Sequence, residues 1–241
     1  MNIYLNILSA KKNNQKLLAV LIDPEKITPE KIPAFFEKVH QSIATHIFVG
    51  GSTDENNQTE NIVSEIKKAT HLPVLLFPGD ANQITNKADG ILFLSLLSGR
   101  NPTFLIEQQV KAAPILQKTN LEIIPTGYIL IDGGKETAVQ KVSNTNPIAQ
   151  NNLDLILNTA MAGEFLGKKL IYIEAGSGAT VPVDANIIKK CQTQLNIPLI
   201  VGGGIRTKEQ LESAFNSGAD LAVIGTAFEN DTSFFNDLKK Q

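Results

Sequence analysis

The chain has 241 residues, of which 42% are hydrophobic and 19% are charged, and its formal net charge is -2. This composition fits a globular protein with a buried core, and it lacks the basic excess typical of nucleic-acid binding. Cys191 is the only cysteine, which excludes a disulfide within the chain, and no apolar run reaches the roughly 18 residues of a membrane span. We therefore expect a cytoplasmic domain without signal peptide, membrane span or nucleic-acid partner.

The first part of the chain alternates helical patterns with apolar runs of strand length. An amphipathic opening with Ile3, Leu5, Ile7 and Leu8 predicts a helix that covers one end of the fold. Continuous apolar runs indicate parallel strands buried on both faces, and three of them follow, at residues 17–22, 46–49 and 73–77. Helices are expected between them.

The segment between the third and fourth strands breaks this alternation. Only residues 78–90 separate the third run from the next one at residues 91–94, and they show no helical periodicity. A crossover helix needs more room than this once its turns are counted. We therefore predict that the third helix is missing or reduced to a turn.

Later strands are predicted at residues 122–131, 170–173, 198–201 and 221–224. Helices are predicted at residues 103–118 and 147–166, after Asp184, from Thr207, and at the carboxyl end around Phe234, Phe235 and Leu238. The run Asp132-Gly133-Gly134-Lys135 predicts a turn, and an irregular segment is expected from there to Asn146. The pattern predicts one α/β domain over residues 1–241, a TIM-barrel-like (β/α)₈ barrel.

Functional residues are expected where the strands end, because the carboxyl ends of barrel strands share one rim. The sixth strand ends at Glu174 and opens into a glycine loop, Gly176-Ser177-Gly178, which offers a carboxylate beside bare backbone. A tight turn explains this stretch equally well on its own. The loops at Gly203-Gly204 and Gly225-Thr226, however, stand where barrels frequently bind phosphate. Together these loops favour a phosphorylated substrate.

Asp23 and Ser52 follow the first two strands, so we expect them to be neighbours on this rim. A carboxylate and a hydroxyl suit Mg²⁺, which keeps several waters and shares substrate phosphates. Asp80 could join them, and a simple turn or cap at Asp23-Pro24 is an equally good explanation. The three histidines have no common ligand spacing, so zinc is not expected.

Eight motifs occur in order along the chain: LIDPEK (21–26), FVGGS (48–52), FPGD (77–80), SLLSGRNP (95–102), PTGYILI (125–131), YIEAGSGA (172–179), VGGGIR (201–206) and IGTAFE (224–229). Together they resemble the geranylgeranylglyceryl phosphate synthase family over nearly the whole chain, and YIEAGSGA is the most specific of them. The fold of that family, a (β/α)₈ barrel without its third helix, agrees with the gap at residues 78–90.

The resemblance implies a prenyltransferase that joins sn-glycerol 1-phosphate to geranylgeranyl diphosphate as an ether and releases diphosphate, with Mg²⁺ as cofactor. It implies that Asp23 and Ser52 bind the metal and that Glu174 is the general base. The glycerol-phosphate site that it implies consists of Tyr172, Ile173, Glu174, Ala175, Gly176, Ser177, Gly178, Gly203, Gly204, Gly225 and Thr226. The family also implies a homodimer or a larger homo-oligomer.

The missing helix would leave an apolar slot for the prenyl chain, with Phe77, Leu96, Leu97 and Phe104 as candidate lining residues, although an ordinary core explains each of them too. Arg100 is a candidate for contact with the diphosphate. Related heptaprenylglyceryl phosphate synthases typically carry lysine two positions before the metal aspartate, where this chain has Leu21. This favours the geranylgeranyl substrate. Another phosphate-binding barrel enzyme and a non-catalytic barrel that binds polyprenyl phosphates remain alternatives.

Overall fold

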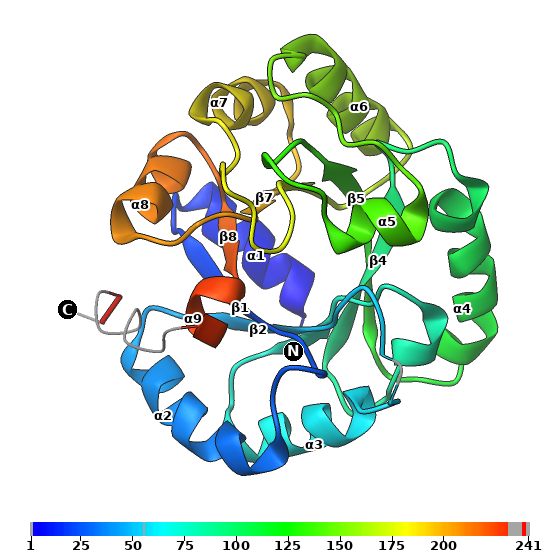
Figure 1. Ribbon diagram of the computed structural model, residues 1–241, viewed down its shortest axis with the longest axis vertical. Coiled ribbons are helices and arrows are strands. Elements are labelled where there is room, and N and C mark those ends of the chain that lie inside the picture. Colours follow the sequence, from blue (N-terminus) through cyan, green and yellow to red (C-terminus); the bar gives the residue numbers. More distant parts are fainter. Residues whose placement is uncertain (1, 55, 231–237, 240–241) are drawn as a thin grey trace.

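Eight parallel strands close into a barrel in chain order, from β1 to β8 (Figure 1). The computed structural model describes residues 2–54, 56–230 and 238–239. The strands are β1 (Leu17–Ile22), β2 (His46–Val49), β3 (Val74–Leu76), β4 (Gly90–Leu96), β5 (Glu122–Leu130), β6 (Leu170–Glu174), β7 (Leu199–Gly202) and β8 (Leu221–Ile224). The ring closes where β1 pairs with β8. The predicted (β/α)₈ barrel is confirmed.

Side chains on each strand alternate between the barrel interior and the layer beneath the helices. On β6, Leu170 and Tyr172 belong to the inner cluster, whereas Ile171 and Ile173 pack in the outer one. All five residues of β6 are buried. Strands buried on both faces have no need of polar residues at alternate positions, which explains the continuous apolar runs of the sequence.

Helices surround the barrel (Figure 1). The outer ring contains α2 (Ile32–Gln41), α3 (Thr59–Ala69), α4 (Gln108–Leu116), α6 (Leu153–Phe165), α7 (Ala185–Gln194) and α8 (Lys208–Asn216). Shorter pieces are the 3₁₀ turn η1 (Pro29–Lys31), the π-helical turn η3 (Thr103–Glu107), α5 (Ala138–Ser143) and α9 (Thr226–Asn230). Within the described residues, no helix combines the length and the hydrophobicity needed to cross a bilayer.

The third crossover lacks a full helix. Between β3 and β4, where the structure describes every residue, the chain forms only the 3₁₀ turn η2 (Ala81–Gln83). Asp80 caps this turn by accepting a hydrogen bond from the Asn82 backbone N–H at 2.9 Å. The prediction of a missing or reduced third helix is therefore confirmed.

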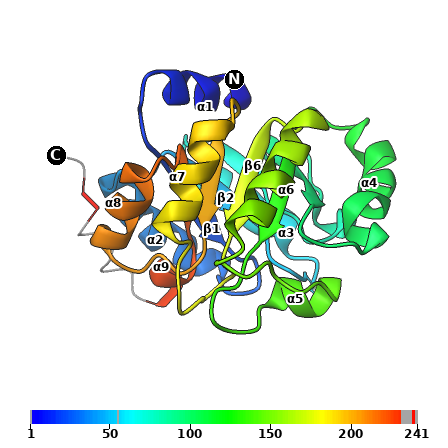
Figure 2. The ribbon, with the colours of Figure 1, turned by 90° about the horizontal axis from the view of Figure 1, so that it is seen from above.

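Helix α1 (Ile3–Lys12) lies across the end of the barrel where the strands begin (Figure 2). Its apolar residues Ile3 and Ile7 are buried in the cluster that fills the barrel interior. The Glu122 carboxylate, at the start of β5, accepts hydrogen bonds from the backbone N–H groups of Ile3 and Tyr4, the second at 2.8 Å. The expected covering helix is confirmed, and Glu122 fixes its first turn.

Some helix boundaries differ from the prediction. Helix α6 begins at Leu153 rather than near Pro147, because Ile148 forms a β-bridge with Ile131 and cannot be helical. The segment expected to be irregular contains α5, which is capped by the Thr137 side chain. The prediction of a terminal helix falls on Phe234 and Phe235, which lie outside the described residues.

The contact between Glu122 and α1 can be tested by substitution. Glu122→Ala removes both acceptors of the first turn, and we expect the free energy of unfolding in urea to fall by about 1–3 kcal/mol. Glu136→Ala is the matched control, because its carboxylate is 58% exposed and pairs only with Lys141 in the described structure. The control should stay within about 0.5 kcal/mol of the wild type. Equal stability of the two variants would contradict this role of Glu122.

Candidate active site

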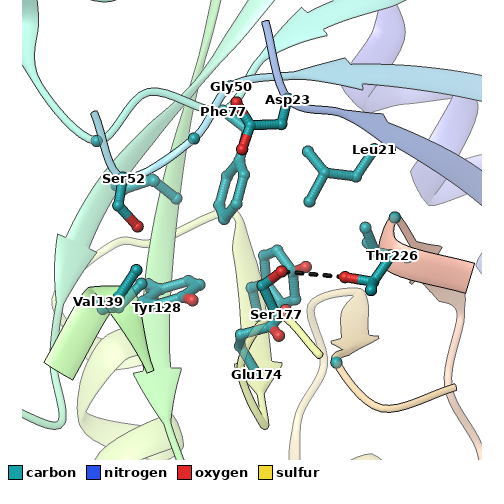
Figure 3. A pocket seen from close by; sticks show the side chains of 18 of the residues that line it. Leu21, Asp23, Gly50, Ser52, Phe77, Tyr128, Val139, Glu174, Ser177 and Thr226 are labelled. Carbon is teal, nitrogen blue, oxygen red and sulfur yellow. Dashed lines mark hydrogen bonds between the residues drawn. The ribbon is translucent and has the colours of Figure 1, made fainter. Parts of the chain in front are cut away.

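A cavity of about 330 Å³ opens among the carboxyl ends of the strands (Figure 3). It lies at the end of the barrel opposite α1. Strands β1, β2, β6, β7 and β8 and their loops contribute the polar part of its wall: Asp23, Ser52, Glu174, Ser177, Gly178, Gly203, Gly204, Gly225 and Thr226. The residues expected on the rim thus line one cavity.

Glu174 is the last residue of β6 and has the same inward orientation as Tyr172, two positions earlier. Its partner in the sheet register on β7 is Gly202. A Cβ atom on Gly202 would stand 2.6 Å from Glu174 Oε2, and one on Gly203 would collide with Oε1. The carboxylate therefore occupies space that these two glycines leave open.

Glu174 is 6% exposed, and burial raises the pKa of its carboxyl group from 4.5 to about 7. The neighbouring Tyr172 hydroxyl and the Gly176 backbone N–H oppose this rise, and the N–H donates to Oε1 at 2.7 Å. The Tyr172 hydroxyl lies beside the carboxylate without hydrogen-bond geometry. A carboxyl group with a pKa near neutrality can take up and release a proton under ordinary conditions, as a general base must.

Three aromatic rings form the apolar floor of the cavity. The Tyr172 ring lies 5.4 Å from that of Phe77 and 5.3 Å from that of Tyr128, measured between centroids. Burial, together with the charge of Glu174, raises the pKa of both tyrosine hydroxyls well above 10, so both tyrosines stay neutral. Phe77 projects into the cavity between Asp23 and Glu174 (Figure 3).

The loop after β6 and the start of α9 form the polar side of the cavity. The Ser177 and Thr226 hydroxyls are hydrogen-bonded at 3.1 Å (Figure 3). Gly178 and Gly203 adopt positive φ values of 67° and 81°, which favour glycine. Arg206 Nη2 donates to the carbonyl of Gly178 at 3.0 Å and to that of Ala179 at 2.8 Å. A fixed loop without bulky side chains lets an anion approach the backbone N–H groups closely.

Asp23 and Ser52 both line the cavity, which brings the two predicted metal residues to one wall. The Asp23 carboxylate lies close to Gly51 and pairs with Lys26 at 3.3 Å. The described residues contain no cluster of three or more His, Cys, Asp or Glu side chains suited to a metal ion. One carboxylate and one hydroxyl fit Mg²⁺ as the donor set if substrate phosphates and water complete its coordination.

Other predicted residues take different places. Ile173 and Ala175 pack in the outer cluster, and Gly176 acts through its backbone N–H. Asp80 lies outside this cavity, since it caps η2 and accepts from Gln108 Nε2 at 2.8 Å. Arg100 lies away from the cavity and donates to the carbonyls of Leu97 and Gly99.

Apolar residues just after β3, on β4 and in η3 line the side of the cavity nearest the reduced crossover: Phe77, Leu94, Leu96 and Phe104. Leu97 is not among them, and Leu21 lines the cavity from β1, next to Gly225 (Figure 3). A second cavity of about 40 Å³ lies between η2, β4 and α4. The Gln108 and Gln109 side chains line both cavities. The two cavities therefore adjoin where the third helix is reduced, and a slot for the prenyl chain at this place stays a prediction.

Some lining residues were not predicted. Val139 and Val142 come from α5, a helix that the sequence analysis missed. The sequence signal for this helix was Thr137 followed three residues later by Gln140, the spacing of a capping box. In the structure Thr137 Oγ1 accepts a hydrogen bond from the Gln140 N–H at 3.1 Å. Lys26 and Arg206 also line the cavity. Lys26 ends the motif LIDPEK and Arg206 ends VGGGIR, but neither was predicted as a site residue.

A closed (β/α)₈ barrel with a buried carboxyl beside a glycine-rich loop, at the carboxyl ends of its strands, is the architecture of a barrel enzyme. Comparison with protein families is more specific. Residues 11–240 match the PcrB family, and the chain belongs to this family.

Similar proteins extend over nearly the whole chain. A geranylgeranylglyceryl phosphate synthase from Flavobacterium johnsoniae is 59% identical over 97% of this chain and 96% of its own. One from Zunongwangia profunda is 60% identical over 93% and 95%, respectively. The crystal structure of (S)-3-O-geranylgeranylglyceryl phosphate synthase from Thermoplasma acidophilum with sn-glycerol-1-phosphate superimposes with a TM-score of 0.92. Its sequence is 34% identical, with 99% of this chain and 96% of that chain covered.

The raised pKa of Glu174 predicts how stability depends on pH. Between pH 4.5 and about 7 the folded chain holds this proton more tightly than the unfolded chain, so stability falls as the pH rises through this range. Glu174→Gln keeps an acceptor for Gly176 but carries no charge. We expect the variant to match the wild type at pH 4 and to exceed its free energy of unfolding by about 3 kcal/mol at pH 8.

Urea denaturation across this pH range measures the difference. Glu212→Gln on the exposed side of α8 is the matched control and should leave the pH dependence unchanged. A constant difference between Glu174→Gln and the wild type from pH 4 to pH 8 would show that the carboxyl is not perturbed by burial.

Proposed function

We propose that this chain is a prenyltransferase that forms the ether bond between sn-glycerol 1-phosphate and geranylgeranyl diphosphate and releases diphosphate. The observation that carries this proposal is the position of Glu174, a buried carboxyl with a pKa of about 7 beside the glycine-rich loop. The similarity to geranylgeranylglyceryl phosphate synthases over almost the whole chain supports the same reaction.

The reaction forms a bond between a glycerol hydroxyl oxygen and C1 of the prenyl group while the bond from C1 to the diphosphate oxygen breaks. The backbone of Gly203, Gly204 and Gly225 holds the glycerol phosphate, so that one hydroxyl faces Glu174. Glu174 accepts the proton of that hydroxyl as the new bond forms. The apolar side of the cavity, with Phe77, Leu94, Leu96 and Phe104, receives the prenyl chain.

The proposal includes Mg²⁺ held by Asp23 and Ser52 together with the diphosphate. When bound, the ion supplies positive charge that stabilises the leaving diphosphate. Lys26, which pairs with Asp23 and lines the same wall, offers a second cation to this part of the cavity. Asp23 and Ser52 follow β1 and β2, and the glycerol-phosphate loops follow β6, β7 and β8, so different loops of the rim bind the two anionic groups.

Two further proposals concern the length of the prenyl substrate and the oligomeric state of the protein. Leu21 lines the cavity where heptaprenylglyceryl phosphate synthases typically carry lysine, which favours geranylgeranyl over heptaprenyl diphosphate. We also propose a homo-oligomer, because Phe165 and Leu166 are 78% and 76% exposed at the end of α6 and form an apolar surface suited to self-association. A cytoplasmic location stays a prediction.

Turnover tests the main proposal. Purified protein with labelled geranylgeranyl diphosphate, sn-glycerol 1-phosphate and Mg²⁺ should yield a lipid-extractable phosphate product, with kcat/KM rising through about pH 7 as Glu174 ionises. Glu174→Gln should lower kcat by about 100- to 10,000-fold, because the base is lost. Calorimetry should still detect glycerol phosphate binding to this variant. Absence of any product from the wild type would refute the prenyltransferase, and a non-catalytic carrier would then be favoured.

Asp23→Ala tests the metal residues. We expect activity to fall by about 100-fold or more and the remaining activity to lose its dependence on Mg²⁺. Asp80→Ala is the matched control, because Asp80 follows β3 on the same rim but lies outside the cavity, and this variant should keep its activation by Mg²⁺. The readout is the initial rate against Mg²⁺ concentration. An unchanged activation curve for Asp23→Ala would remove Asp23 from the metal site.

A further inference from the structure

The turn Asp132-Gly133-Gly134-Lys135, to which the proposed reaction gives no role, is fixed on the glycine-rich loop after β6. The Gly133 carbonyl accepts hydrogen bonds from the backbone N–H groups of Thr180 at 2.9 Å and Val181 at 3.0 Å. It also accepts one from Thr180 Oγ1 at 3.1 Å. A Cβ atom on Gly133 would collide with the Ala175 carbonyl oxygen. These contacts hold the backbone that precedes Lys135 against this loop.

The Lys135 ammonium lies against Gly178. Its Nζ stands 2.8 Å from the point that a Cβ atom on Gly178 would occupy, and the Thr226 methyl group is 4.0 Å from the same point. Lys135 and Thr226 are therefore on the same side of Gly178, over its bare Cα atom. Gly178 and Thr226 both line the active-site cavity, so the ammonium stands at its edge.

Lys135 is a cation without an ion-pair partner or a hydrogen bond among the described residues. The adjacent Glu136 pairs with Lys141 instead, at 3.1 Å, and Asp132 Oδ1 accepts from the Gly134 N–H at 2.9 Å. Arg206 donates to the Gly178 carbonyl, so two cationic side chains touch one glycine. This concentration of positive charge favours an anion beside Gly178.

We propose that Lys135 binds the phosphate group of the glycerol substrate. The ammonium donates to a phosphate oxygen from the outer edge of the cavity, while the backbone at Gly203 and Gly225 binds from the inner side. This inference rests on the proposed function and extends it. Charge-assisted hydrogen bonds of this kind are stronger than neutral ones, and the Lys135 contact requires no movement of the backbone.

Calorimetry with sn-glycerol 1-phosphate alone, without prenyl diphosphate, tests the proposal directly. We expect Lys135→Met to raise the Kd about tenfold and Lys135→Arg to stay within about threefold of the wild type. Lys189→Met is the matched control, because it removes the same charge from the exposed face of α7, and its Kd should be unchanged. In steady-state assays Lys135→Met should raise the KM for glycerol phosphate and leave kcat and the KM for the prenyl substrate unchanged.

Inorganic phosphate is the second probe. If Lys135 contacts the phosphate group itself, Lys135→Met should raise the Kd for inorganic phosphate and for glycerol phosphate by the same factor. Equal affinities of wild type and Lys135→Met for glycerol phosphate would overturn the role of Lys135 while turnover by the wild type still supports the prenyltransferase. An equal loss of affinity in Lys189→Met would also overturn it, since the effect would then come from net charge. A wild type that neither binds glycerol phosphate nor forms product would refute the proposed function itself.

Discussion

The burial of one carboxylate, that of Glu174, is the constraint on which the rest of the site depends. A carboxylate loses much of its hydration inside a barrel, and this cost is offset only in part by the Gly176 N–H. The remaining cost appears as a pKa close to 7. Bare backbone at Gly202, the last residue of β7, and at Gly203 after it leaves the space that the carboxylate occupies. The carboxylate at the end of β6 therefore requires glycine at both positions.

The barrel rim separates three kinds of chemistry. The loops after β1 and β2 provide the oxygen atoms of Asp23 and Ser52. The loops after β6, β7 and β8 provide bare backbone and hydroxyl groups, and the side near β3 and β4 is apolar. The short third crossover contributes to this separation, because η2 fills less space than a helix and a small second cavity lies between η2, β4 and α4. A reaction between a charged glycerol derivative and a long apolar chain needs such a division.

Much of this arrangement could be predicted from the sequence because parallel strands buried on both faces are marked by continuous apolar runs, and their ends share one rim. Asp23, Ser52, Glu174 and Thr226 were placed correctly on that rim without any knowledge of tertiary contacts. Contacts between loops could not be predicted in this way. The pKa of Glu174 depends on what covers it, and the position of Lys135 depends on hydrogen bonds from residues more than 40 positions away. The start of α6 was displaced by a bridge between Ile131 and Ile148, which tertiary structure imposes on a local helix signal.

Closure of the ring has a consequence for folding during synthesis. Residues 17–20 of β1 pair with residues 221–224 of β8, and Lys11 of α1 forms an ion pair with Asp220 at 3.0 Å. These contacts join segments separated by about 200 positions, so they form late and their loop-closure entropy is offset only when the last strand is present. The cavity contains residues from both β1 and the start of α9 and is complete only after β8 has left the ribosome. A chain truncated before β8 would expose the apolar edges of β1 and β7, and aggregation rather than partial activity is its expected fate.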